Sequence, residues 1–349
     1  MTATLHRDYG LLGPEGAAAD ARGLVSAAWY KAPIPRVRLK QLMQRSDGPA
    51  IRDTVLWLGL LGLFGGLGAW AFVAGNLVWI PLLAVYGVLY GSSSDSRWHE
   101  AGHRTAFKTP WLNDVVYQIA CFMIMRSPTV WRWSHTRHHT DTLIVGRDPE
   151  VLAMRPPAVG RIALNLFGLV DVPKAMGGMV QHASGRLSDE EKSFVPEAEW
   201  PRVYREARVW VVIYAAVIVT SVATRSILPL LLVGGPRLYG AWLHLVFGLT
   251  QHAGLAEDVL DHRLDSRTVY MNPVFRFLYW NMNYHVEHHM YPLVPFHALA
   301  ALHEEIKDVC PPAYPSTVAA FREIIPTLAR QRRDPTYFVR RPLPDEAGA

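Results

Sequence analysis

Cysteine is almost absent from this sequence, with two residues in 349. So few thiols exclude a disulfide scaffold, a thiolate zinc ribbon and a cysteine-ligated iron–sulfur cluster. Charge is also sparse, because Asp, Glu, Lys and Arg make up 19% of the chain, against about 25% in soluble globular domains. Half of the residues are hydrophobic. This much apolar surface excludes a disordered chain and favours a membrane protein.

The first 50 residues contain no apolar run of the kind that a secretory signal peptide carries, so we expect a polar N-terminal arm. The formal net charge is +5, and the basic residues flank the apolar runs. This distribution favours a membrane surface over nucleic acid as the partner.

Two long apolar zones organise the chain. The first covers residues 54–91, 38 positions without Asp, Glu, Lys or Arg. Since one membrane span needs about 20 residues, this zone predicts two helices with a turn near Gly75 and Asn76. The second zone, 209–249, is interrupted by Arg225 and by a Gly-Gly-Pro-Arg stretch at 234–237. It predicts helices over about 209–224 and 227–250, and the alternative is one long helix followed by a short helix from Pro236.

The basic residues predict the orientation of these spans. Lys and Arg number eight in the N-terminal arm and 14 in residues 92–206, and such loops stay on the cytoplasmic side. We therefore expect an all-α integral membrane protein in the cytoplasmic membrane, with four transmembrane helices as two hairpins, a cytoplasmic helical cap and both termini cytoplasmic. The predicted divisions are an N-terminal arm (1–53), hairpin 1 (54–91), cap (92–206), hairpin 2 (207–250), cap (251–330) and a flexible tail (331–349).

Histidine is the most informative residue type. The chain has 15 histidines, and nine of them fall into spaced clusters. The clusters are box 1 (His99 and His103), box 2 (His135, His138 and His139), the lone His252, and box 3 (His285, His288 and His289). Every cluster follows a predicted span or lies in a predicted cytoplasmic segment. A metal centre assembled at the membrane surface is therefore expected, within reach of an apolar substrate.

The spacing of these histidines predicts two metal ions. Helix positions i and i+4 share a face with Cβ atoms about 5–6 Å apart, so His99 and His103 can bind one ion. In the pattern His-x-x-His-His the two adjacent imidazoles diverge by about 100° around the helix. His138 and His139 therefore point to different ions. Nine imidazoles divided over two ions give four or five each, too many for one tetrahedral zinc.

Two other interpretations remain open from the residues alone. The segment His-Glu-Ala-Gly-His also matches the zinc-protease motif His-Glu-x-x-His, in which Glu100 would be the general base. A non-enzymatic metal-handling membrane protein is the other alternative, although transport sites usually lie within the spans. Substitution of His285 separates the two-metal centre from the protease, since a protease built on His99, Glu100, His103 and one more ligand would tolerate it.

With this ordered set of boxes, the chain resembles the membrane-bound, histidine-rich di-iron family of fatty acid desaturases and hydroxylases. The resemblance covers nearly all of residues 50–310 and implies that all nine clustered histidines ligate two iron ions. It implies an O2-dependent oxidoreductase that removes hydrogen from an unactivated C–H bond of a lipid or hydrocarbon-like substrate, by desaturation or hydroxylation.

Shorter runs resemble one subgroup of that family. Residues 91–100, 131–141 and 146–150 are similar to hydrocarbon oxygenases of rhizopine catabolism. This likeness implies a ferredoxin and its NAD(P)H reductase as electron source. It also makes O-demethylation or hydroxylation of a small methoxylated metabolite an alternative reaction. The chain itself offers no dinucleotide fingerprint and no cluster-binding cysteines, so a separate donor is expected.

Side chains around the boxes are candidates for orienting the imidazoles by hydrogen bonds, with solvated surface charge as the other interpretation. They are Asp95, Glu100, Asp141, Asp148, Asn281 and Glu287. A basic face would suit an acidic ferredoxin, or equally lipid headgroups. Its residues are Arg132, Arg137, Arg147 and Arg155.

Overall fold

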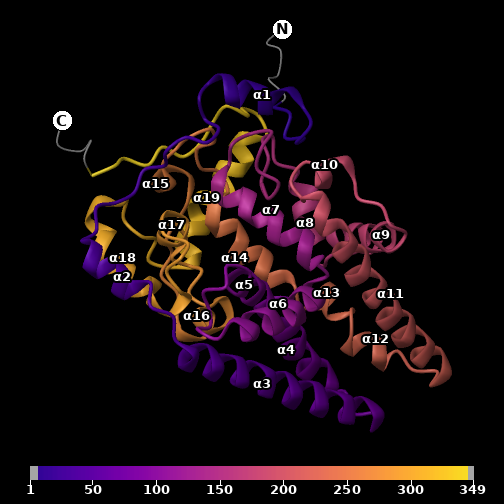
Figure 1. Cartoon of the computed structure of the whole chain (residues 1–349). Helices are drawn as coiled ribbons and strands as arrows, with labels where there is room; N and C mark the ends of the chain where they lie inside the picture. Colours follow the sequence, from indigo (N-terminus) through magenta and orange to yellow (C-terminus); the bar gives the residue numbers. More distant parts are fainter. Residues whose placement is uncertain (1–6, 345–349) are drawn as a thin grey trace. The chain divides into compact units, whose positions relative to one another are not determined.

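The computed structural model describes residues 7–344, and within this range the chain is helical (Figure 1). Two isolated β-bridges, Thr268 with Tyr284 and Val269 with Tyr314, are its only extended pairings, so the described range contains no β-strand. The predicted all-α class is confirmed for these residues. Positions 1–6 of the predicted arm and 345–349 of the predicted tail lie outside the described residues.

The chain forms two compact units, which are described separately. Of the described residues, unit 1 contains 7–45, 133–159 and 247–344, and unit 2 contains 46–132 and 160–246. The α-helices are α1 Pro14–Ala21, α2 Arg36–Leu42, α3 Asp47–Val73, α4 Trp79–Gly91, α5 Ser93–Gly102, α6 Pro110–Ile124, α7 Pro128–Thr140, α8 Val159–Asn165, α9 Asp171–Ala183, α10 Asp189–Lys192, α11 Trp200–Ala223, α12 Leu228–Leu232, α13 Pro236–Tyr239, α14 Trp242–His252, α15 His262–Asp265, α16 Pro273–Tyr279, α17 His285–Met290, α18 Leu299–Ile306 and α19 Thr317–Gln331. Three 3₁₀ turns complete the set: η1 Glu197–Glu199, η2 Phe296–Ala298 and η3 Lys307–Val309.

In unit 2, α3 and α4 pack against each other as a hairpin. The turn between them contains Gly75, whose φ of +68° is the left-handed conformation that glycine adopts most easily. Small residues allow close packing: a Cβ on Gly68 would lie 2.5 Å from Cδ2 of Leu83. The indole of Trp57 on α3 donates a hydrogen bond to the carbonyl of Leu89 at 2.8 Å.

Within residues 7–344, two stretches are long and apolar enough to cross a membrane, Arg36–Val73 and Glu197–Ala223. In both, most of the apolar window is exposed on the protein, with 28% and 17% of its residues buried. A core helix of a soluble protein would bury one face, so this exposure indicates contact with lipid.

The second apolar zone differs from the prediction. The helix predicted over 227–250 is wrong, because residues 228–252 form three helices, α12, α13 and α14. Gly234 has φ +81° between α12 and α13. A Cβ on Gly240 would lie 1.9 Å from the carbonyl carbon of Gly87 on α4. The chain breaks where its backbone passes against α4, an approach that only glycine permits.

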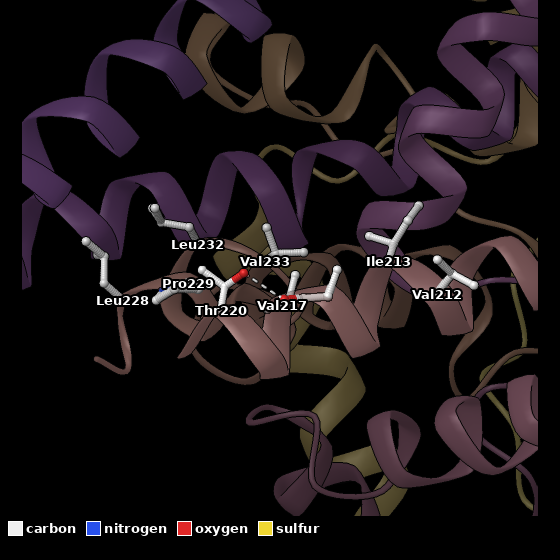
Figure 2. A pocket seen from close by; sticks show the side chains of 9 residues that line it. Val212, Ile213, Val217, Thr220, Leu228, Pro229, Leu232 and Val233 are labelled. Atoms are coloured by element: carbon white, nitrogen blue, oxygen red, sulfur yellow. Dashed lines mark hydrogen bonds between the residues drawn. The ribbon is translucent and has the colours of Figure 1, made fainter. Parts of the chain in front are cut away.

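A hollow of about 540 Å³ lies between α11 and the α12 segment of unit 2 (Figure 2). Its lining consists of aliphatic side chains and Thr220, whose hydroxyl donates to the carbonyl of Ala216 on the same helix. Ile213 and Leu232 also line a second hollow of about 340 Å³. Both hollows therefore offer apolar walls.

Candidate metal centre

Seven of the nine clustered histidines belong to unit 1. Box 2 lies on α7, the lone His252 is the last residue of α14, and box 3 forms most of α17. Helix α17 is one and a half turns long, and all six of its residues are buried. Such a short helix gains its stability from packing rather than from propensity. The same packing fixes the direction of its imidazoles.

Four imidazoles in unit 1 form one group: His138, His252, His285 and His289, each offering a nitrogen within 4.8 Å of the others. The Nε2 atom of His285 lies 2.9 Å from Nε2 of His252 and 3.0 Å from Nε2 of His289. Two ligands at right angles on one ion, with metal–nitrogen bonds of about 2.1 Å, would be about 3.0 Å apart. The spacing of the nitrogens therefore fits a shared metal ion.

Hydrogen bonds on the far side of three rings determine which nitrogen faces this group. Nδ1 of His252 lies 2.8 Å from the backbone carbonyl of Asp265, which only accepts hydrogen bonds. The hydroxyl of Thr142 donates to the carbonyl of His138, so it accepts from Nδ1 of His289 at 3.2 Å. Nδ1 of His138 lies 2.9 and 3.0 Å from the carboxylate oxygens of Asp148.

At His252 and His289 these contacts place the proton on Nδ1 and the lone pair on Nε2, and Asp148 keeps Nδ1 of His138 protonated. A cation beside Nε2 of His285 would accept the lone pairs of His252 and His289, which lie 2.9 and 3.0 Å from that atom. This chemistry matches a metal site whose imidazoles are oriented by outer hydrogen-bond acceptors.

A second group includes His135, His139 and His288 of unit 1. Nε2 of His139 lies 3.2 Å from Nε2 of both His135 and His288. The ring of His139 stacks on the ring of His289 with centroids 4.4 Å apart. The two groups are therefore adjacent, and the neighbours in each His-His pair belong to different groups, as the helical spacing predicts.

Box 1 belongs to unit 2. His99 and His103 lie one turn apart at the end of α5, with ring centroids 5.2 Å apart. Their ligand atoms lie within 4.8 Å of each other. Within this unit the two rings form the pair that one ion can bind.

Burial and neighbouring charges move the pKa values of these imidazoles in opposite directions. Burial lowers the pKa of His252 to about 4, and the charge of His138 adds to the effect. Burial also lowers the pKa of His289, well below its ordinary value. The same burial acts on His138, but the carboxylate of Asp148 outweighs it and raises that pKa to about 9. His252 and His289 are therefore neutral at pH 7, which is the form that binds a metal.

Of the side chains predicted to orient imidazoles, Asp148 does so. Three of the others bind arginines instead of imidazoles. Asp141 accepts from Arg147 at 2.9 Å, and Asp95 accepts from Arg126 at 2.9 Å. Asn281 accepts from Nε of Arg276.

The two glutamates inside the boxes are both buried. Glu287 binds Nδ1 of His303 at 2.5 Å and the hydroxyl of Thr268 at 2.5 Å. Glu100 accepts from the hydroxyl of Thr105 at 3.1 Å.

The sequence reasoning missed four contributors to the site. Glu150 lies 3.0 Å from Nδ1 of His135 and also accepts from Ser134. The hydroxyl of Thr142 accepts a hydrogen bond from His289, and the carbonyl of Asp265 accepts one from His252. The ring of His262 lies 5.0 Å from that of His289 and stacks on Trp29 at 4.2 Å. Only Glu150 had a sequence signal, since it lies two residues after Asp148.

The basic face expected from the sequence is not fully exposed. Arg155 is buried, and its guanidinium lies 3.2 Å from the carboxylate of Glu257. Arg137 and Arg147 of unit 1 both face Asp141, at 3.8 and 2.9 Å. These arginines stabilise loops of unit 1, and their positive charge is partly neutralised there.

A comparison with models of protein families matches residues 77–320 to the family described as fatty acid desaturase. The matched region is more than two thirds of the chain and contains all nine clustered histidines. Membership implies a membrane-bound oxidoreductase, in agreement with the two spanning candidates and the imidazole groups. The chain belongs to the fatty acid desaturase family.

Proposed function

We propose that this protein is a di-iron, O2-dependent oxidoreductase that oxidises an unactivated C–H bond of a lipid or hydrocarbon-like substrate. The observation that carries the proposal is the convergence of imidazole Nε2 atoms in two adjacent groups of unit 1. Imidazole suits iron, copper and zinc alike. Family membership supports iron.

In this proposal the first group of imidazoles holds one iron. The second group holds the other, together with His99 and His103 of box 1. Bound iron would supply the O2 activation and one-electron chemistry that side chains lack. The chain's own residues fix the rings: Asp148 and Glu150 accept from Nδ1 of His138 and His135, which keeps the opposite nitrogen available.

The apolar hollow on α11 would accept a lipid-like chain more readily than a small methoxylated metabolite. Its walls are aliphatic, and the hydroxyl of Thr220 is already used within its own helix. A polar metabolite would leave its hydroxyl groups without partners on such walls, which costs about 1–3 kcal/mol for each buried group. An apolar chain needs no such partners.

The zinc-protease alternative is less well supported. A general base must reach the water that it activates. The carboxylate of Glu100 is fully buried and accepts a hydrogen bond from Thr105. That reaction needs one more metal ligand and would leave six or seven of the nine clustered imidazoles without a role.

We also propose that the protein crosses the membrane four times, with both termini in the cytoplasm. Helices α3 and α11 are the long spans. Helix α4 and the segmented stretch α12–α14 would be their partners in two hairpins. The electron donor would be a separate ferredoxin with its reductase.

Metal analysis of the purified protein tests the metal site. We expect about two iron ions per chain, as the two ligand groups require, and their loss in His138→Ala and His288→Ala. His297→Ala is the matched control, because His297 lies outside both groups and should keep its metal. One zinc that survives both substitutions would contradict the di-iron site and favour the protease.

Two further assays test the reaction. His285→Ala should abolish substrate-dependent O2 consumption, because its Nε2 lies at the centre of the first group. Mass spectrometry of lipids and small metabolites, with and without the gene expressed, identifies the product. A demethylated polar metabolite in place of an oxidised lipid would reverse our assignment of the substrate class. Metal accumulation by vesicles without O2 consumption would indicate a metal-handling protein.

A further inference from the structure

We infer that helices α8 and α9, with the turn that joins them, lie in the headgroup region of the bilayer and insert apolar side chains between lipids. The sequence alone predicts that these residues belong to the cytoplasmic cap. The segment 160–183 belongs to unit 2, as does α11, against which α9 packs. Figure 1 shows α9 beside the N-terminal half of α11.

Large apolar side chains are exposed along this segment. Leu164 is 52% exposed, Phe167 61%, Leu169 54% and Val180 61%. Single exposed apolar residues are ordinary, but a group of this kind marks a surface that contacts something apolar. None of these helices is long enough to cross a bilayer.

Helix α9 has one wide apolar face, and only part of that face is buried. Val172 and Met179 are buried on its inner part, whereas Met176 and Val180 are exposed on its outer part. Pro173, Met176 and Val180 follow the i, i+3, i+7 pattern of one helical stripe. In water the outer stripe of such a helix would be polar. The outer stripe of α9 is suited to lipid.

Contacts at both ends of α9 indicate how deep this helix lies in the bilayer. At its C-terminal end, the carbonyl of Ala183 accepts from Nε of Arg208 at 3.0 Å. Arg208 is the last charged residue of α11 before its apolar run. The end of α9 therefore lies where α11 passes from polar to apolar surroundings.

The turn at the other end lies at a similar boundary. Gly168, with φ +63°, approaches the carbonyl of Arg237 so closely that a Cβ there would be 2.8 Å away. Arg237 in turn donates to the carbonyl of Gly91 at 3.3 Å. Gly91 is the last residue of the charge-free zone 54–91. With both ends at such boundaries, α9 lies along the membrane surface, as interfacial helices do.

Charge favours lipid as the occupant of this surface. Residues 159–187 carry three exposed basic side chains, Arg161, Lys174 and Arg186, against one acidic residue, Asp171. Asp171 binds the side-chain amide of Asn165 at 2.6 Å. Long basic side chains beside an apolar stripe can extend to anionic headgroups while their stems contact acyl chains.

Site-directed spin labelling of the full-length protein in vesicles with anionic lipids tests this inference. Cysteine would replace Phe167, Met176 or Val180 in separate variants, and the native Cys121 and Cys310 are buried. Controls are Glu190→Cys, exposed on α10, and Val219→Cys, 65% exposed within α11. Collision with O2 reports an apolar surrounding, and collision with a nickel chelate reports water.

We expect spin labels at the three α8–α9 positions to collide more with O2 than with the nickel chelate. The ratio of the two collision rates should lie between the ratios measured for the two controls. Nickel accessibility equal to that of position 190 would overturn the inference. Dipolar broadening between labels on different chains would also overturn it, since a second copy rather than lipid would then cover the surface. Three label positions guard against a single variant that fails to fold. The result does not depend on metal or activity, so it can fail without affecting the proposed reaction.

Discussion

Substitution of Gly240 by alanine should separate two parts of unit 2 that touch through their backbones. An ideal Cβ at Gly240 would lie 1.9 Å from the carbonyl carbon of Gly87, 2.0 Å from its oxygen and 2.4 Å from its Cα. Ordinary contacts of this kind begin at 3.4 Å. The backbones of α4 and of the turn before α14 would have to move apart by more than 1 Å.

That movement also affects two hydrogen bonds. The hydroxyl of Ser92 donates to the carbonyl of Gly240 at 2.6 Å and accepts from the amide of His244 at 3.0 Å. Each contributes about 1 kcal/mol to stability, and overpacking costs about 1–3 kcal/mol more. We expect Gly240→Ala to lower the free energy of unfolding by about 3–5 kcal/mol, a large part of the usual total.

Unfolding in mixed micelles titrated with a denaturing detergent, followed by tryptophan fluorescence, measures this change. Gly87→Ala should lose less, since its Cβ would first meet the ring of Tyr239, a side chain that can move. Gly62→Ala on α3 is the matched control, because nothing lies within 4 Å of its Cβ. That variant should be as stable as the wild type or more so, by up to about 1 kcal/mol.

The order of stability of the three variants tests whether the backbone approach of Gly240 to Gly87 limits packing. If Gly240→Ala unfolds within about 1 kcal/mol of the Gly62→Ala control, the backbone approach does not limit packing. The proposed cause of the break in the stretch 228–252 would then be wrong. A loss of metal binding in Gly240→Ala alone would add that α4 positions box 1, since α5 follows α4 directly.

Three further predictions concern the site, the pH dependence of stability and the partner. Glu150→Gln should weaken metal binding about 10- to 100-fold, because the carboxylate that accepts a hydrogen bond from the His135 ring is lost. Competition with a chelator measures the metal affinity, and Glu304→Gln, at an exposed position, is the control. Burial raises the pKa of Glu191, but hydrogen bonds from His182 and Ser188 outweigh it and hold the pKa below its ordinary value. Glu191 therefore stabilises the fold above about pH 4.3, and this stabilisation is lost as the pH falls. His182→Leu removes one of these hydrogen bonds, so the midpoint of acid unfolding, measured by circular dichroism, should move to higher pH. An unchanged midpoint would count against this pair. Turnover with an acidic ferredoxin should fall as salt rises while helicity stays constant, whereas salt-insensitive turnover would contradict charge-guided docking.

Local spacing explains why some of the site was predictable. Positions i, i+3 and i+4 have a fixed geometry on a helix, so the division of His138 and His139 between two groups followed from the sequence. The role of Asp148 was also within reach, because it is only ten residues from His138. Thr142 and the carbonyl of Asp265 were not predictable. Neither side-chain type nor spacing indicates which acceptor will lie behind a given ring.

The sequence by itself determined the helical class, the apolar zones and the histidine clusters, since each depends on composition or on the periodicity of one segment. The tertiary structure decided the rest. It joined box 2 to His252 and box 3, which come more than 100 residues later in the chain, and it assigned Asp141 to arginines instead of imidazoles. It also broke the stretch 228–252 where Gly240 meets Gly87. Such choices depend on which distant backbone or side chain comes within contact distance, and no local pattern encodes that.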